Sequence, residues 1–267
     1  MKRDNTLKEE TLKLDNGMIM VVSDIHFPYE DKSAVTAFIR EVGFKKPDII
    51  VLNGDLLDFY KLSKFSKDPA GKNPEEEIEM CKTFLKCLRR EAGKECKIYY
   101  TIGNHESRLR KYILDNAPMV AGLMENVFSL LKLEEPDVVG CASLLVNDIF
   151  MFKHGSRLGN KSGLSAIKEL EAHYLSGATG HVHKLARYSV RKSKRRFLWL
   201  ETGCLCSLDP EYMIDPDWEQ GIGIVTFEKG KLKNAQVYPI VNGQVLYDWF
   251  KRMQYSNKSI TIVFTKQ

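Results

Sequence analysis

The chain has 267 residues, 43% of them hydrophobic and 10% aromatic, and a formal net charge of +5. A chain of this length and composition can bury a sizeable core, and we expect a single domain over residues 1–267. No apolar stretch approaches the roughly 18 residues of a membrane span, and residues 1–16 are charged without a signal-peptide core. We therefore expect neither a membrane protein nor a secreted one, but a cytoplasmic protein whose six cysteines are reduced thiols.

The first part of the chain alternates predicted strands and helices. The pair Asn16-Gly17 predicts a hairpin turn that leads into a buried strand at Met18–Val22. A helix follows, with Ser33 as its expected N-cap and Gly43 at its expected end. A second strand then ends at Asp55, and the resulting β-α-β unit implies parallel pairing of the two strands.

The next predicted elements continue this alternation. A loop is expected from Phe59 to Asn73, and Asn73 then caps a helix whose first residue is Pro74. The third strand is Lys97–Ile102. Two further helices are predicted at 107–115 and 118–132.

Strands in series replace this alternation in the second part of the chain. A strand at 138–146 and another at 149–152 are expected to form a hairpin around Asn147-Asp148. A helix is predicted near 163–175, and the strands after residue 206 are expected to complete a second sheet. The expected fold class is α/β, a four-layer α-β-β-α sandwich of two mixed sheets flanked by helices.

Five apolar runs end in short segments rich in glycine, carboxylates and imidazoles. The segments are Ser23-Asp24-Ile25-His26, Gly54-Asp55-Leu56-Leu57-Asp58, Gly103-Asn104-His105-Glu106, Lys153-His154-Gly155 and Gly180-His181-Val182-His183. Five of the six histidines lie in them, whereas chance would scatter these residues. Oxygen and nitrogen ligands without thiolates suit manganese, iron or zinc, and their number is enough for two ions that share a carboxylate.

This ordered series resembles the calcineurin-like metallophosphoesterases over roughly residues 18–206. The resemblance implies two divalent metal ions, with Mn²⁺ expected and Fe or Zn as alternatives. It implies two metal sites that share Asp55 as a bridging ligand. The ligands of the first site would be Asp24, His26, Asp55 and His183. The ligands of the second would be Asp55, Asn104, His154 and His181. It also implies that His105 is the catalytic residue, and that Asp58 holds a ligand or His105 in position.

The same resemblance indicates hydrolysis of a phosphate ester. The protein phosphatases of the family carry an Asp-Arg pair where this chain has Asp58-Phe59, and they lack the Gly-His-x-His ending. The diesterase and Mre11-type nuclease branches have that ending, although their third motif more often ends in aspartate than in Glu106. The stretch at 201–209 is similar to phage-encoded members.

We therefore expect a phosphodiesterase with nucleic acid or nucleotide substrates. The alternatives are a phosphomonoesterase or small-nucleotide hydrolase, and a non-catalytic scaffold of the kind found in a retromer subunit that has lost its catalytic histidine. The intact His105 argues against the scaffold.

Basic residues near the motifs are candidates for substrate binding. Arg108 and Arg110 follow the third motif and could hold a phosphate, or could lie on a solvated helix face. Residues 184–196 contain seven basic residues and no acid, which predicts either a rim for a polyanion or a solvated hairpin. The side chains expected to form that rim are Arg191, Lys192, Lys194 and Arg195.

Overall fold

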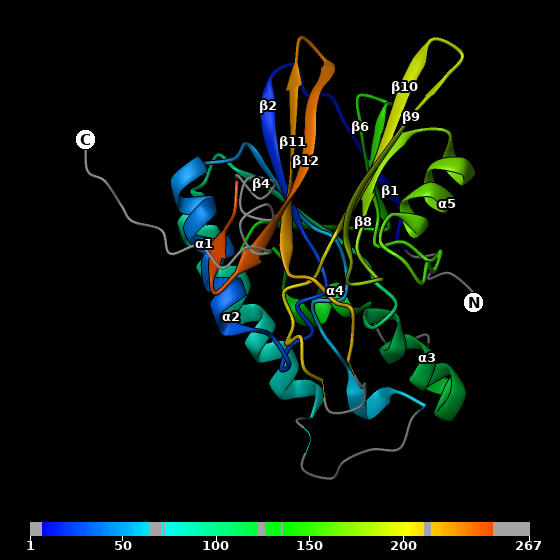
Figure 1. Cartoon of the computed structure of the whole chain (residues 1–267). Coiled ribbons are helices and arrows are strands. Elements are labelled where there is room, and N and C mark those ends of the chain that lie inside the picture. The colour runs from blue at the N-terminus through cyan, green and yellow to red at the C-terminus, as the bar shows by residue number, and fades with distance from the viewer. Residues whose placement is uncertain are drawn as a thin grey trace.

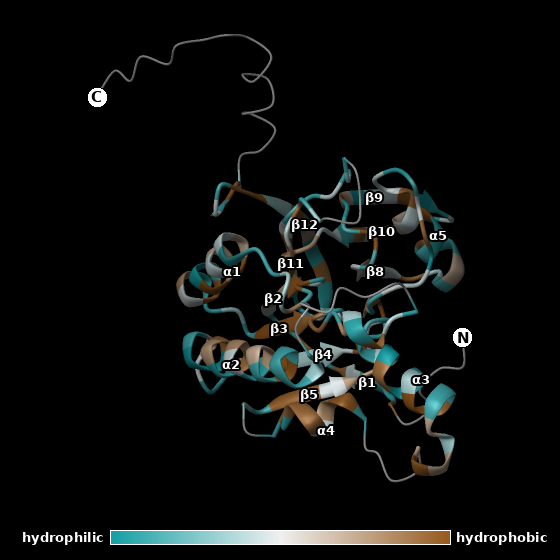
Figure 2. Ribbon diagram, turned by 90° about the horizontal axis from the view of Figure 1, so that it is seen from below, coloured by the Kyte–Doolittle hydropathy of each residue, from teal (hydrophilic) through white to brown (hydrophobic). Residues whose placement is uncertain are grey.

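The computed structural model describes residues 7–64, 71, 73–121, 126–134, 136–210 and 215–247. Two β-sheets pack face to face, and helices cover their outer faces (Figure 1). Seen from below, α1 and α2 lie on one side of the molecule and α5 lies on the other (Figure 2). This arrangement confirms the predicted four-layer sandwich.

The seven-stranded sheet contains the first three predicted strands in parallel. Its order is β13 (Gln244–Val245), β12 (Lys231–Val241), β11 (Gly221–Glu228), β2 (Gly17–Val22), β3 (Ile49–Leu52), β4 (Lys97–Thr101) and β5 (Val138–Cys141). Strands β2 to β5 pair in parallel, and β11 joins β2 antiparallel. The C-terminal strands therefore extend the first sheet, and the expectation that they complete the second sheet was wrong.

The six-stranded sheet is also mixed. Its order is β1 (Glu9–Leu12), β6 (Ser143–Val146), β7 (Phe150–Phe152), β8 (Ser176–Thr179), β10 (Arg195–Thr202) and β9 (Leu185–Lys192). Strands β7, β8 and β10 pair in parallel, so their carboxyl ends lie at one edge of the sheet.

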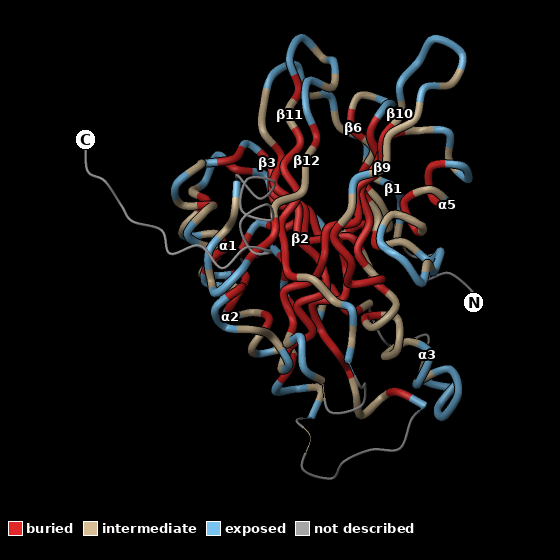
Figure 3. The backbone as a smooth tube through the Cα atoms, in the orientation of Figure 1, coloured by how far each residue is buried: buried red, intermediate tan, exposed pale blue. Residues whose placement is uncertain are grey.

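Alternation along the strands assigns each side chain to a layer. Met20 and Val22 of β2 belong to the cluster under the helices, whereas Ile19 and Val21 belong to the cluster between the sheets. Because both faces are covered, the strands are continuous apolar runs. Buried backbone is concentrated in the centre of the molecule, and the β9–β10 tip is exposed (Figure 3).

The helices follow their expected order. Helices α1 (Lys32–Lys45), α2 (Pro74–Ala92) and α4 (Val127–Leu131) pack on the seven-stranded sheet, and α5 (Leu164–His173) packs on the other. Helix α3 (Glu106–Asn116) directly follows the third motif, and short 3₁₀ helices lie at Tyr60–Leu62 and Pro118–Val120. No described helix is long and apolar enough to span a membrane.

Helix boundaries differ from the prediction where a better cap was available. The N-cap of α1 is Asp31, not Ser33, because the Asp31 carboxylate accepts the backbone N–H groups of Ser33 and Ala34. The helix passes Gly43 and ends at Lys45, and its C-cap Lys46 takes the left-handed conformation. The predicted cap of α2 is confirmed, with a reciprocal capping box between Asn73 and Glu76.

Three predicted elements are divided in the structure. The pair Asn16-Gly17 forms no hairpin, because β1 and β2 belong to different sheets. The strand expected at 138–146 breaks at Ala142, so that β5 pairs with β4 and β6 pairs with β1 and β7. Within 118–132 the described residues form only the short 3₁₀ helix and α4, and residues 122–125 lie outside the described residues. The hairpin around Asn147-Asp148 is confirmed.

Candidate metal centre

The five strand-end segments meet between the two sheets. Asp24 follows β2, Asp55 follows β3, and Asn104 follows β4, while His154 follows β7 and His181 follows β8. Four overlapping groups of the described residues lie close enough to hold metal ions: Asp24, His26 and His183; His26, Asp55 and His105; Asp55, His154 and His181; and His183, Cys204 and Cys206. The structure thus brings all seven predicted ligands together with His105 and Asp58.

Several of these residues have strained backbones. Asp24, Asp55 and His183 have φ angles of 55°, 54° and 54°, and His26 and His181 are also in the left-handed region. For residues other than glycine this conformation costs roughly 1 kcal/mol or more each, and such strain concentrates at functional sites. Backbone bonds from Asp24 to Gly54 and from His26 to Asp55, both 3.0 Å, hold the turns in place.

Two glycines leave room for the carboxylates. A Cβ atom at Gly103 would lie 2.1 Å from Asp55 Oδ1, and one at Gly180 would lie 2.3 Å from Asp24 Oδ2. Either contact would force the carboxylate aside. The glycines of these two motifs are therefore needed for the close approach of backbone to ligand.

The first ligand group surrounds Asp24. The Nε2 atoms of His26 and His183 face each other at 3.1 Å, and His183 Nε2 lies 3.1 Å from Asp24 Oδ1. Asp24 Oδ1 is buried and makes no hydrogen bond among the described residues. Ligands bound to one ion at about 2.1 Å are about 3 Å apart when adjacent, so these three atoms fit one cation.

The second group lies on the other side of Asp55. His154 Nε2 is 3.0 Å from Asp55 Oδ2 and 3.0 Å from Asn104 Oδ1. The other nitrogen of His154 donates to the carbonyl of Asn53 at 2.9 Å, which orients Nε2 toward the centre. Asp55 Oδ2 also lies 4.0 Å from His26 Nε2, so one carboxylate oxygen faces both groups.

The electrostatics match a site for cations. Burial opposes charge on the imidazoles, yet Asp55 and Asp24 raise the pKa of His154 to about 9, and Asp24 raises the pKa of His183 to about 9. Burial likewise opposes charge on Asp55, but His154 and His105 hold its pKa well below the ordinary value. Protons on the buried imidazoles thus balance the negative charge of the carboxylates. Bound metal ions would balance that charge in place of the protons.

A sequence model of the calcineurin-like phosphoesterases matches residues 17–205. The chain belongs to this family.

Similar sequences and structures come from phages, bacteria and eukaryotes. The Gene 54 proteins of mycobacteriophages D29 and L5 are 26% and 25% identical to this family member, over 86% of this chain and 96% of theirs. Among solved structures, Vacuolar Protein Sorting 29 from Cryptosporidium parvum has a TM-score of 0.47 and 17% identity, over 87% of this chain and 96% of its own. The phosphoesterase YfcE of E. coli has a TM-score of 0.39 and 12% identity, over 82% and 97%.

In this family member Asp58 connects two histidines. His26 Nδ1 donates to Asp58 Oδ2 at 3.1 Å, and His105 Nδ1 donates to the Asp58 carbonyl at 2.9 Å. Asp58 thus orients both a predicted ligand and the predicted catalytic residue. His105 Nε2 remains directed toward the centre, 3.8 Å from Asp55 Oδ2.

Arg108 lies at the site, in contact with His105. Its guanidinium donates to His105 Nε2 at 2.9 Å and to the Asp58 carbonyl at 2.8 Å. A guanidinium only donates, so His105 carries its proton on Nδ1 in this arrangement. Arg110 lies two residues further along α3 and is partly exposed.

Glu106 has a role that sequence reasoning did not assign. Its buried carboxylate accepts the N–H groups of Asp55 and Gly103 on one oxygen. The other oxygen accepts the N–H groups of Leu56 and Leu57 and the Tyr100 hydroxyl. Glu106 therefore connects the turn of the bridging ligand to the turn of Asn104 and His105.

Residues from distant segments also support the ligands. Asn53 donates to the carbonyls of Lys153 and Ala178, and so joins the two sheets beside the site. The ring of His183 contacts Trp218, with 4.3 Å between ring centroids, and its Nδ1 lies 3.9 Å from Cys206 Sγ. The sequence did not assign either residue to the site, because neither lies in a recognisable motif.

The basic hairpin is not brought to the centre. Its root, where Leu185 pairs with Thr202, follows His183, but its tip is seven residues further along β9, about 23 Å at 3.3 Å per residue. The tip points away from the strand ends (Figure 1). Only an extended ligand could touch both the centre and the predicted rim residues: Arg191, Lys192, Lys194 and Arg195.

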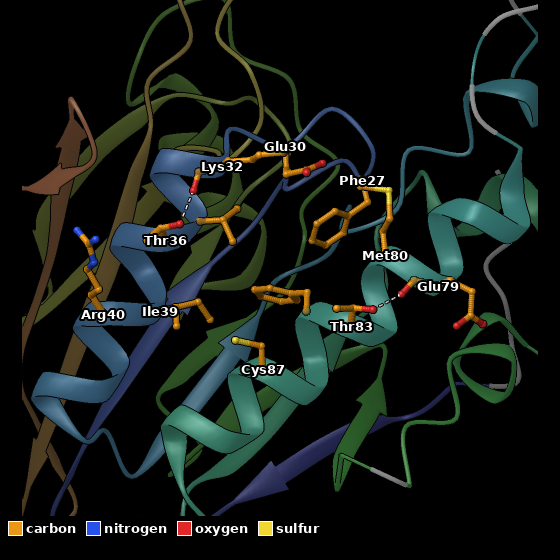
Figure 4. A pocket seen from close by; sticks show the side chains of 12 residues that line it. Phe27, Glu30, Lys32, Thr36, Ile39, Arg40, Glu79, Met80, Thr83 and Cys87 are labelled. Carbon is orange, nitrogen blue, oxygen red and sulfur yellow. Dashed lines mark hydrogen bonds between the residues drawn. The ribbon is translucent and has the colours of Figure 1, made fainter.

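A separate groove of about 680 Å³ lies between α1 and α2 (Figure 4). Phe27, Val35 and Ile39 line it from one side, and Met80 and Phe84 line it from α2. None of the predicted site residues contributes to this groove. The groove is therefore a feature separate from the candidate metal centre.

Proposed function

We propose that this chain is a dinuclear metal-dependent phosphoesterase that hydrolyses phosphodiester bonds, with nucleic acid or nucleotide substrates favoured. The observation that supports it best is Asp55 Oδ2, which faces His154 at 3.0 Å on one side and His26 at 4.0 Å on the other. A single carboxylate oxygen between two groups of ligands suits a pair of ions about 3.5–4 Å apart. Two divalent ions, Mn²⁺ or else Fe or Zn, would neutralise the phosphate charge and lower the pKa of a bound water.

In this proposal His105 protonates the leaving oxygen. The Asp58 carbonyl fixes its Nδ1, and its partly exposed ring presents Nε2 to the centre. Arg108 occupies Nε2 in the present arrangement, and a substrate phosphate offers the guanidinium a stronger, bidentate partner. Binding of the phosphate to Arg108 would thereby free Nε2 to take up a proton from solvent. The ring would then donate that proton to the leaving oxygen, while Nδ1 keeps its own proton on the Asp58 carbonyl.

Phe59 argues against a protein substrate. The protein phosphatases carry arginine at this position, but here the side chain is fully buried and its backbone N–H donates to Glu77. No donor from this position reaches a substrate. This supports the diesterase branch that the Gly-His-x-His ending suggested.

Hydrolysis of two chromogenic esters tests the proposal. With added Mn²⁺ the protein should hydrolyse bis-p-nitrophenyl phosphate faster than p-nitrophenyl phosphate, and chelation should abolish both rates. Faster hydrolysis of the monoester would favour the phosphomonoesterase. No hydrolysis of either ester, or of single-stranded DNA, RNA and small nucleotides, by protein that contains two ions would favour the non-catalytic scaffold.

A further inference from the structure

Two buried thiols lie behind His183, on the side of the ring that faces away from Asp24. Cys204 and Cys206 are 0% and 3% exposed, and their sulfurs form a group with a His183 ring nitrogen in which all ligand atoms lie within 4.8 Å of one another. Cys206 Sγ lies 3.9 Å from His183 Nδ1, whereas Nε2 of the same ring lies 3.1 Å from Asp24 Oδ1. One imidazole therefore faces a carboxylate with one nitrogen and a pair of thiols with the other.

The backbone holds this pair of thiols in place. Cys204 forms a β-bridge with Gln220, and the Gln220 side chain donates to the Cys206 carbonyl at 2.9 Å. Leu205, between the two cysteines, is fully buried, and its N–H donates to the Asp24 carbonyl at 3.0 Å. Both sulfurs are thus positioned relative to a predicted metal ligand by contacts that do not involve the sulfurs.

The spacing of the sulfur and nitrogen atoms fits one thiophilic ion. Zinc binds cysteine sulfur at about 2.3 Å and histidine nitrogen at about 2.0 Å, so adjacent ligands of these two kinds are about 3.5 Å apart in a tetrahedral site. The observed 3.9 Å between Cys206 Sγ and His183 Nδ1 is close to this value. Two thiolates and an imidazole suit Zn²⁺, whereas Mn²⁺ favours oxygen ligands.

Apolar packing does not account for the pair. The other buried cysteines, Cys81, Cys96 and Cys141, belong to the hydrophobic clusters that cover the two faces of the seven-stranded sheet. Among the described residues, neither Cys204 nor Cys206 is a member of such a cluster, although Leu205 between them is. The thiols that lie together are therefore those placed beside an imidazole.

We propose that Cys204, Cys206 and Nδ1 of His183 form a metal site for a thiophilic divalent ion, with Zn²⁺ as the expected ion. This site is separate from the two predicted oxygen and nitrogen sites but shares His183 with the first of them. Binding of the ion releases the protons of both thiols and of Nδ1, and the His183 ring then bridges two ions. The chain would in this way hold a soft ion directly beside a centre that suits harder ones.

Co²⁺ is the probe, because it occupies zinc sites and gives a near-ultraviolet charge-transfer band only where thiolates bind it. Protein reconstituted with Mn²⁺ and kept reduced with a phosphine is titrated with Co²⁺. The parent should develop this band up to about one equivalent, and Zn²⁺ should remove it. Any Co²⁺ that replaces Mn²⁺ among oxygen and nitrogen ligands adds nothing to the band.

Replacement of single thiols locates the site. Cys204→Ser and Cys206→Ser should each lose most of the band, and Cys204→Ala and Cys206→Ala should do the same. Cys141→Ser is the matched control, since it changes another buried thiol and should keep the band. His183→Ala should weaken Co²⁺ binding at the thiolates at least about 10-fold. Circular dichroism identifies variants that remain folded, and the comparison is made among these.

Absence of the band in the folded parent would overturn the inference, and so would a band that persists in the variants of both cysteines. Unchanged Co²⁺ affinity in His183→Ala would refute the shared ligand. The band does not depend on turnover, so this result is distinct from that of the ester assays. A parent that shows the band but hydrolyses no ester would retain the thiolate site and lose the proposed function.

Discussion

Replacing Glu106 by glutamine should destabilise the fold without changing its shape. Five donors converge on this carboxylate, three on Oε1 and two on Oε2, and the side chain is 1% exposed. Glutamine offers one acceptor oxygen and one amide NH₂. In its best orientation the oxygen keeps the three donors, and the NH₂ group faces the N–H groups of Asp55 and Gly103.

Two hydrogen bonds to a charged acceptor are then lost. Each such bond contributes roughly 1.5–3 kcal/mol, so Glu106→Gln should lower the free energy of unfolding by about 3–6 kcal/mol. This is a large part of the roughly 5–15 kcal/mol of a typical domain. Mn²⁺ affinity should fall as well, because the lost bonds position the backbone of the bridging ligand.

Urea unfolding of the metal-free protein, followed by circular dichroism, measures the loss. Glu79→Gln is the matched control, because it makes the same chemical change on the exposed face of α2, where the Glu79 carboxylate forms an ion pair with Lys82. It should cost less than about 0.5 kcal/mol. A Glu106→Gln variant within about 1 kcal/mol of the parent would refute the role assigned to this carboxylate.

Two further predictions concern the centre, and a third concerns the buried Glu77 of α2. Asp55→Asn should impair both metal sites, whereas Asp24→Asn should mainly weaken one. Metal analysis of the parent protein reconstituted with Mn²⁺ should show about two ions per chain. One ion or none under conditions of turnover would contradict the dinuclear assignment. His105→Ala should keep its metals and lose roughly 10²–10⁴-fold in turnover, with part of the loss absent for a p-nitrophenolate leaving group; loss of metal with an unchanged rate per bound ion would contradict this role. Burial raises the pKa of Glu77 from 4.5 to about 8, so this group stabilises the fold below pH 4.5 relative to higher pH, and that stability is lost as the pH rises through 8. Glu77→Gln keeps an acceptor for Phe59 N–H, and its Tm should match that of the parent near pH 4.5 but exceed it at pH 9. Equal Tm values of the two proteins at both pH values would show that ionisation of Glu77 does not destabilise the fold.

The sequence predicted the centre well because of how parallel strands end. Asp24, Asp55 and Asn104 each follow an apolar run, and β-α-β connections place such ends at one edge of a sheet. His154 and His181 follow two strands of the second sheet that are themselves parallel. Residue types and spacing are therefore enough to predict that these side chains meet.

Local patterns were insufficient where the choice lay between two sheets. The run at 138–146 has the composition of one strand, but Ala142 N–H bonds to Lys8, and the chain changes sheets there. The pair Asn16-Gly17 has the composition of a hairpin turn, yet the strands on its two sides belong to different layers. In both places partners distant in sequence decide the pairing, and no short window contains them.

The same limit explains which site residues were missed. Only a few residue types bind metal ions, so a histidine at a strand end can be predicted as a ligand from the sequence. A residue that contacts or orients the ligand can be of almost any type, so the sequence does not single it out. Trp218 lies 35 positions after His183 and reaches it only because Glu219 pairs with the backbone of His183. The hairpin tip at Lys194 shows the converse, since only 11 positions separate it from His183 but the extended strand carries it to the far end of the sheet. Distance along the chain is therefore a poor guide to distance from the metal centre, both for the hairpin tip and for the tryptophan.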